Sequence, residues 1–181
     1  MSGHDAVKRT PWRALTAGAL LLLALPFIAR EADARGKSVA DQLVGTWTLV
    51  LVDNVLPDGT RVQLYGAQPQ GLLMFDGQGR YSLHILRAGR TRFAASDKSQ
   101  GTPEENQATV RGTNSHFGRY SVDEKERTLT FHIDHASFPN WEGTEQRRTF
   151  TLTGDELKYI VPAPTTGGTG TLGEVQWRRA K

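Results

Sequence analysis

The chain has 181 residues, 22 Lys and Arg against 19 Asp and Glu, and a net charge of +3. This length favours one domain and excludes a TIM barrel or a two-domain nucleotide enzyme of ordinary size. The absence of Cys excludes a disulfide scaffold, a Cys-based zinc site and a thiol nucleophile. Because Lys and Arg form no stripe interleaved with aromatic residues, we expect no nucleic-acid partner.

Residues 1–34 have the pattern of a secretory signal peptide. A basic stretch precedes an apolar run from Ala14 to Ala29, and Ala32-Asp33-Ala34 is a small-x-small cleavage site. An uncleaved anchor is the alternative, but the run contains Pro26 and is shorter than the roughly 20 apolar residues that a membrane span needs. We predict cleavage before Arg35, export to the periplasm or the medium, and membrane contact only through this segment. Residues 35–181 would then form the domain.

The first half of this domain alternates apolar and polar residues, with Gly, Asp, Asn and Pro between the runs, as in antiparallel β-sheet. The run 43–52 predicts a strand with Trp47, Leu49 and Leu51 on one face. A turn at 56–60 and a short strand at 61–65 follow. Residues 71–76 and 80–86 predict a hairpin, because Asp76-Gly77 favours a tight turn.

Residues 87–112 are polar and show no clear period. Thr102 suits a helix N-cap and Pro103 the first helical position, so we expect a short helix there. A connection of this length is typical of a lid, a binding loop or a disordered segment.

Alternation resumes in the second half, which predicts five more strands at 117–122, 128–135, 147–153, 156–161 and 172–179. Two loops lie between these strands, an aromatic one at 137–144 and a Pro, Thr and Gly loop at 162–170. We interpret the Gly-rich stretch 167–170 as flexible. The total of eight or nine strands fits a β-sandwich or a closed barrel. No internal repeat indicates a propeller or a solenoid.

Two short motifs favour the barrel. Gly45-Thr46-Trp47 lies in the first predicted strand and Trp177-Arg178-Arg179 in the last. With the stretches 43–50, 55–62, 69–82, 118–159 and 175–179, the chain resembles the bacterial lipocalin-like domain family of calycin type. The segment SFPNWEGT at 137–144 is the most distinctive match.

The resemblance implies an all-β, antiparallel up-and-down barrel of about eight strands with one open mouth. It also implies that Trp47 packs under an arginine of the last strand and plugs the barrel, because a guanidinium on an indole face is a cation–π contact. Alternation places Trp177 and Arg179 on one face and Arg178 on the other. It does not choose between the two arginines.

Seven side chains are candidates for lining the cavity: Tyr65, Tyr81, Tyr120, His135, Phe138, Trp141 and Arg148. His135 follows Leu129, Phe131 and Ile133 on the predicted inner face. Arg148 alternates with Phe150 and Leu152, and an inward arginine is costly unless paired. It therefore indicates a bound carboxylate, a neighbouring Asp or Glu, or a wrong face; a register slip would give the role to Arg147.

His132-Ile133-Asp134-His135 invites a metal or a base–orienter interpretation. His132 and Asp134 share one face of the strand and His135 takes the other, so at most two could bind one metal. His84 or His116 would have to complete such a site. A solvated outer face is the favoured interpretation. A heme held by one strand His is a weaker alternative, and we predict no metal and no cofactor.

The predicted function is binding of a small, mostly hydrophobic molecule in the barrel. The first alternative is an isomerase or cyclase that acts on an apolar substrate in the same cavity, with Tyr, His or Arg as acid–base groups. The second is a filled-barrel envelope protein without ligand. We assign no catalytic residue, because no nucleophile elbow, P-loop or dinucleotide motif is present.

Overall fold

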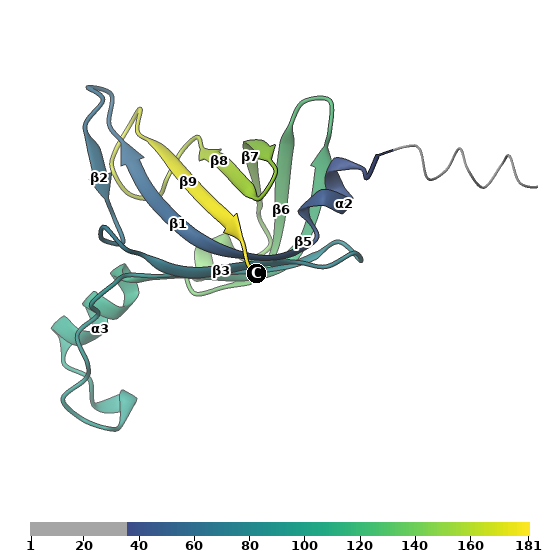
Figure 1. The fold of residues 1–181 in the computed structure, drawn as a ribbon. Coiled ribbons are helices and arrows are strands. Elements are labelled where there is room, and N and C mark those ends of the chain that lie inside the picture. Colours follow the sequence, from purple (N-terminus) through teal and green to yellow (C-terminus); the bar gives the residue numbers. More distant parts are fainter. Residues whose placement is uncertain (1–35) are drawn as a thin grey trace, which may run out of the picture. The chain divides into compact units, whose positions relative to one another are not determined.

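The computed structural model describes residues 36–181, so the predicted signal segment lies outside the described residues. Nine strands form one antiparallel sheet with a few short helices between them (Figure 1). The strands are β1 (Gly45–Val55), β2 (Arg61–Gln63), β3 (Gln70–Phe75), β4 (Arg80–Leu86), β5 (Thr113–Asp123), β6 (Thr128–Ala136), β7 (Glu145–Thr153), β8 (Glu156–Val161) and β9 (Leu172–Arg179). The helices are α2 (Val39–Leu43), η1 (Lys98–Gln100), α3 (Pro103–Arg111) and η2 (Pro139–Trp141).

The sheet closes on itself and forms a barrel. Each strand from β3 to β9 pairs with its chain neighbour, and β9 pairs with β1 from Trp47↔Arg179 to Val55↔Leu172. The ring therefore has eight strands, and β2 is an extra short strand against the far half of β1. The predicted antiparallel up-and-down barrel is confirmed, and the sandwich is excluded because it would leave β1 and β9 unpaired.

The predicted hairpin turn and helix cap form at the expected residues. In the β3–β4 hairpin, Asp76 Oδ1 accepts hydrogen bonds from the backbone N–H groups of Gln78 and Arg80, both at 2.8 Å. Thr102 caps α3 through a capping box, in which its hydroxyl accepts from Glu105 N and Glu105 Oε2 accepts from Thr102 N. The excursion 87–112 thus contains the expected short helix, and no residue of α3 is buried.

Two β-bulges change which side chains face inward. In β1 the pairing with β9 shifts between Leu49 and Leu51, so Val50 is an extra residue and Val52 and Asn54 take the inner face. In β6 the pairing with β5 skips Asp134, so Ile133 points inward while His135 points outward. The prediction that Leu51 shares a face with Trp47 is therefore wrong, as is the inner face predicted for His135, because a bulge reverses the alternation beyond it.

The core fills the part of the barrel near α2. Phe75, Tyr81 and Phe131 stack there at centroid distances of 4.6–6.2 Å. Leu43, Trp47, Leu129, Leu157 and Trp177 are fully buried around them. No helix within residues 36–181 has the length and hydropathy to cross a membrane.

Candidate functional site

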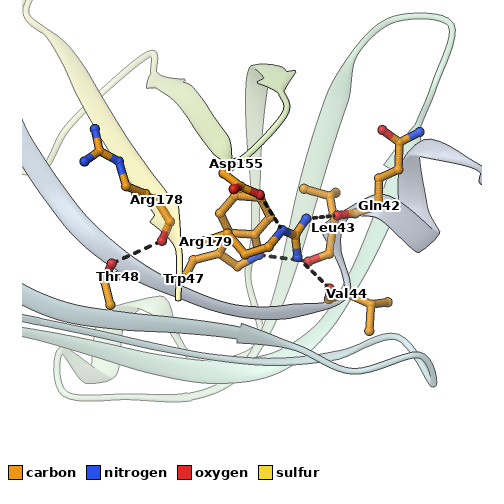
Figure 2. Close-up of polar contacts among 8 residues, drawn as sticks. All are labelled: Gln42, Leu43, Val44, Trp47, Thr48, Asp155, Arg178 and Arg179. Atoms are coloured by element: carbon orange, nitrogen blue, oxygen red, sulfur yellow. Dashed lines mark hydrogen bonds and ion pairs between the residues drawn. The ribbon is translucent and has the colours of Figure 1, made fainter. Parts of the chain in front are cut away.

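One end of the barrel is closed by a cluster around Trp47 (Figure 2). Arg179 Cζ lies 4.2 Å from the centroid of the Trp47 ring, and Arg179 Nη1 donates to Val44 O at 3.0 Å. Arg179 Nη2 donates to Gln42 O, and Trp47 Nε1 donates to Leu43 O at 2.9 Å. The cluster thus holds both α2 and the start of β1 against the end of β9.

The structure selects Arg179 as the plug arginine, which alternation had left open. Arg178 is exposed, its side chain points away from Trp47 in Figure 2, and only its carbonyl takes part, accepting from Thr48 Oγ1 at 3.1 Å. Trp177 is fully buried on the same inner face as Arg179. The sequence missed α2, although Ser38 caps it by accepting from Asp41 N.

The other end holds an open cavity of about 370 Å³. Its floor is apolar, with Leu83, Phe131, Tyr159 and Val175 in the wall nearest the core. Polar side chains enter from the strand ends at the mouth. The loop after β8 lines one side of this mouth, and Asn54 anchors that loop by donating from Nδ2 to Thr166 O at 2.8 Å. The polar lining residues on the strands and the loop before β3 are Asn54, Tyr65, Asn114, His116, Glu145, Gln146, Arg147, Arg148 and Tyr159.

Three of the seven predicted cavity residues line this cavity: Tyr65, Trp141 and Arg148. Tyr81 points inward but is buried beneath it, where its hydroxyl bonds His116 Nδ1 at 2.8 Å. Whether any of them contacts a ligand stays a prediction.

The other three lie elsewhere. Tyr120 is at the closed end, where its hydroxyl donates to Asp76 O at 2.9 Å, because β5 carries it past the core toward α2. Phe138 is 41% exposed and packs on Trp141 from outside, with ring centroids 5.4 Å apart. The β6 bulge turns His135 outward, and its Nδ1 lies 3.4 Å from Glu142 Oε1. The excursion 87–112 contributes no lining residue, so it is not a lid in this structure.

Arg148 is the inward cation of the cavity. Its guanidinium donates to Gln146 Oε1 and, at 2.9 Å, to the backbone carbonyl of Arg147. Within residues 36–181 no carboxylate oxygen lies within 4 Å of it. Burial lowers the pKa of Arg148 from its ordinary value. Arg148 therefore lies on the inner face of β7, as the alternation with Phe150 and Leu152 predicted. Among residues 36–181, no Asp or Glu is its partner.

Burial holds three titratable groups of the inner face, His116, Tyr81 and Tyr159, in their neutral forms near pH 7. Burial, followed by the charges of Arg148 and His84, lowers the pKa of His116 to about 3. Burial raises the pKa of Tyr159 to about 12 and raises that of Tyr81 well above its ordinary value. Arg148 thus supplies the positive charge of a lumen whose other inward groups carry none.

His132 lies on the outer face, as alternation predicted, and His84 lies on the outer face as well. His132 Nδ1 lies 2.9 Å from Glu145, and His84 is held between Ser82 and Ser115. His116 is on the opposite, inner face, so it cannot complete a site with them. Within residues 36–181 no three His, Cys, Asp or Glu side chains are grouped as metal ligands would be.

Several residues that line the cavity were not predicted from the sequence. Asn54, Asn114, His116 and Gln146 all lie within a few residues of a predicted strand end, and the observed strands β1, β5 and β7 extend to include them. The loop 162–166 also lines the mouth. Continuing the alternation past the predicted ends would have found Asn114, His116 and Gln146, but not Asn54, because the β1 bulge reverses the alternation before it.

The comparison with protein families agrees with the barrel. A family model described as a lipocalin-like domain matches residues 44–180. The 4'-hydroxy-3'-methoxypropiophenone carrier protein ppsC of Aspergillus oryzae (strain ATCC 42149 / RIB 40) is 28% identical over 94 residues, covering 48% of this chain and 85% of that protein. The crystal structure of a lipocalin-like protein from Bacteroides uniformis ATCC 8492 is 16% identical, with a TM-score of 0.41, and covers 76% of this chain and 98% of that one. A redesigned β-barrel is also 16% identical, with a TM-score of 0.39 over 78% of this chain and 95% of its own.

Proposed function

The chain belongs to the lipocalin-like domain family, and we propose that it binds a small, mostly hydrophobic molecule in the cavity of its barrel. The observation that carries this proposal is the open cavity of about 370 Å³ with an apolar floor and a few polar groups at the mouth. Cavities of this size and lining are typical of small-molecule sites. The relative from Aspergillus oryzae is named as the carrier of a small aromatic ketone, which supports the same class of function.

The cavity favours binding over catalysis. A general acid or base is most effective when its pKa is near the working pH. Here burial moves the pKa of His116 down to about 3 and that of Tyr159 up to about 12, both away from neutrality. A filled barrel without ligand is disfavoured by the cavity itself.

Export through a cleaved signal at residues 1–34 remains part of the proposal, supported by the sequence pattern alone. Native mass spectrometry of the protein purified from its own host tests both parts. We expect a chain that starts at Arg35 and carries an extra mass released by organic solvent. An intact N-terminus would contradict cleavage.

Binding is tested in solution with N-phenyl-1-naphthylamine, a neutral fluorescent probe. We expect saturable binding that Trp141→Ala weakens about fivefold or more, because the lost aromatic wall is worth on the order of 1 kcal/mol. Phe117→Ala is the control, because Phe117 is an exposed aromatic on the outer face. A protein that carries no extra mass from its host and binds no probe would contradict the proposed function.

A further inference from the structure

The Arg148 side chain has no structural task that accounts for its position. It leaves β7 on the inner face, between Gln146 and Phe150, and enters the lumen. Its two hydrogen bonds go to its own strand, to Gln146 Oε1 and Arg147 O, so it connects no separate parts of the barrel. Partial burial of a guanidinium without a counter-charge opposes folding, because the charge loses part of its hydration.

The carboxylates near the mouth do not neutralise this charge. Glu145 also borders the cavity, but it is exposed and pairs with His132 on the outside of the barrel at 2.9 Å. Asp134 is exposed at the β6 bulge. The neighbours on the inner side are the neutral His116, Tyr81 and Tyr159. Arg147 also borders the cavity, but it is exposed and leaves β7 on the opposite face from Arg148. Among the described residues, Arg148 is therefore the cation that enters the lumen.

We propose that the ligand is an amphipathic organic acid, whose single carboxylate pairs with the Arg148 guanidinium while its apolar body fills the lumen over Phe131 and Val175. This inference rests on the proposed function and narrows its ligand class. A guanidinium presents parallel N–H donors that match the two oxygens of a carboxylate. Arg148 can compensate one negative charge inside the lumen.

The inference is tested with two ligands of nearly the same shape, anthracene-9-carboxylate and anthracene-9-methanol. Each displaces N-phenyl-1-naphthylamine from the full-length chain at pH 7.5. We expect the acid to bind at least tenfold more tightly than the alcohol. Arg148→Gln should abolish this preference, because it should weaken binding of the acid at least tenfold more than binding of the alcohol. Arg148→Lys should retain part of the preference, because it keeps the charge and loses the planar fork.

Arg178→Gln is the matched control, because it removes the same charge from the exposed face of β9. It should leave the preference for the acid unchanged. A wild-type protein that binds probe and alcohol but shows no preference for the acid, or an Arg148→Gln variant that keeps it, would overturn the inference and leave the proposed function standing. A protein that binds neither the probe nor either anthracene would overturn both.

Discussion

Replacing Arg179 by Ala should destabilise the barrel far more than the same change at Arg178. The Arg179 guanidinium covers the Trp47 ring at 4.2 Å and donates to the carbonyls of Val44 and Gln42. The cation–π contact is worth about 1 kcal/mol for a partly exposed pair, and each charge-assisted hydrogen bond about 1.5 kcal/mol. The pair with Asp155 at 3.4 Å adds little, because Asp155 is 71% exposed. Since these effects overlap, we expect a loss of about 2–4 kcal/mol in the free energy of unfolding.

Urea denaturation at pH 7.5 measures this loss. With a slope of about 2 kcal/mol per molar urea, the midpoint for Arg179→Ala should fall by about 1–2 M. Arg178→Ala should shift it by less than about 0.25 M, because an exposed side chain without partners changes stability by at most about 0.5 kcal/mol. Equal shifts for the two variants, or a shift below 0.5 kcal/mol for Arg179→Ala, would refute the assignment of Arg179 as the plug.

Two further predictions concern the inside of the barrel. Burial holds the pKa of His116 near 3 in the folded protein, below the unfolded value of about 6.5. As the pH falls, the unfolded chain therefore binds the proton first. The free energy of unfolding should fall between pH 6.5 and about pH 3, by up to about 1.4 kcal/mol per pH unit. His116→Gln should reduce this slope in urea titrations at pH 5, 6 and 7.5. An unchanged slope in His116→Gln would exclude His116 as its source. Gly118→Ala should lower the free energy of unfolding by more than about 2 kcal/mol, because the new Cβ would lie 2.1 Å from the His132 carbonyl oxygen. Gly77→Ala is the control, because open space surrounds its Cβ, and it should change stability by no more than about 0.5 kcal/mol. Equal urea midpoints for the two variants would contradict this prediction.

The sequence predicted most elements of the fold because their signals are local. Alternation defined strands 80–86, 156–161 and 172–179 with the bounds that the structure has, and Asp76 and Thr102 act as the turn and cap residues expected of them. These features depend on neighbours within a few residues, so they can be derived from the chain without its partners.

The errors in the site have a different origin. A bulge depends on which residue of the paired strand it opposes, so the alternation of β6 alone could not place His135 outside. The strand ends near the mouth are held by pairing with the adjacent strands, which a local sequence pattern does not show. The predicted strands therefore stopped short of Asn54, Asn114 and Gln146. Arg148 was correctly predicted to face inward, because no bulge interrupts β7 between Gln146 and Phe150.

The seam between β1 and β9 has a consequence for how the barrel folds. Every other strand pair of the ring joins neighbours along the chain, but Trp47 pairs with Arg179 across more than 130 residues. Until β9 arrives, β1 exposes a free edge of backbone hydrogen-bonding groups, and the indole of Trp47 lacks its cover. Closing such a distant pair is slow compared with forming hairpins. The open sheet before closure is therefore the species in which chains would pair with one another, and conditions that delay the docking of β9 should favour aggregation over folding.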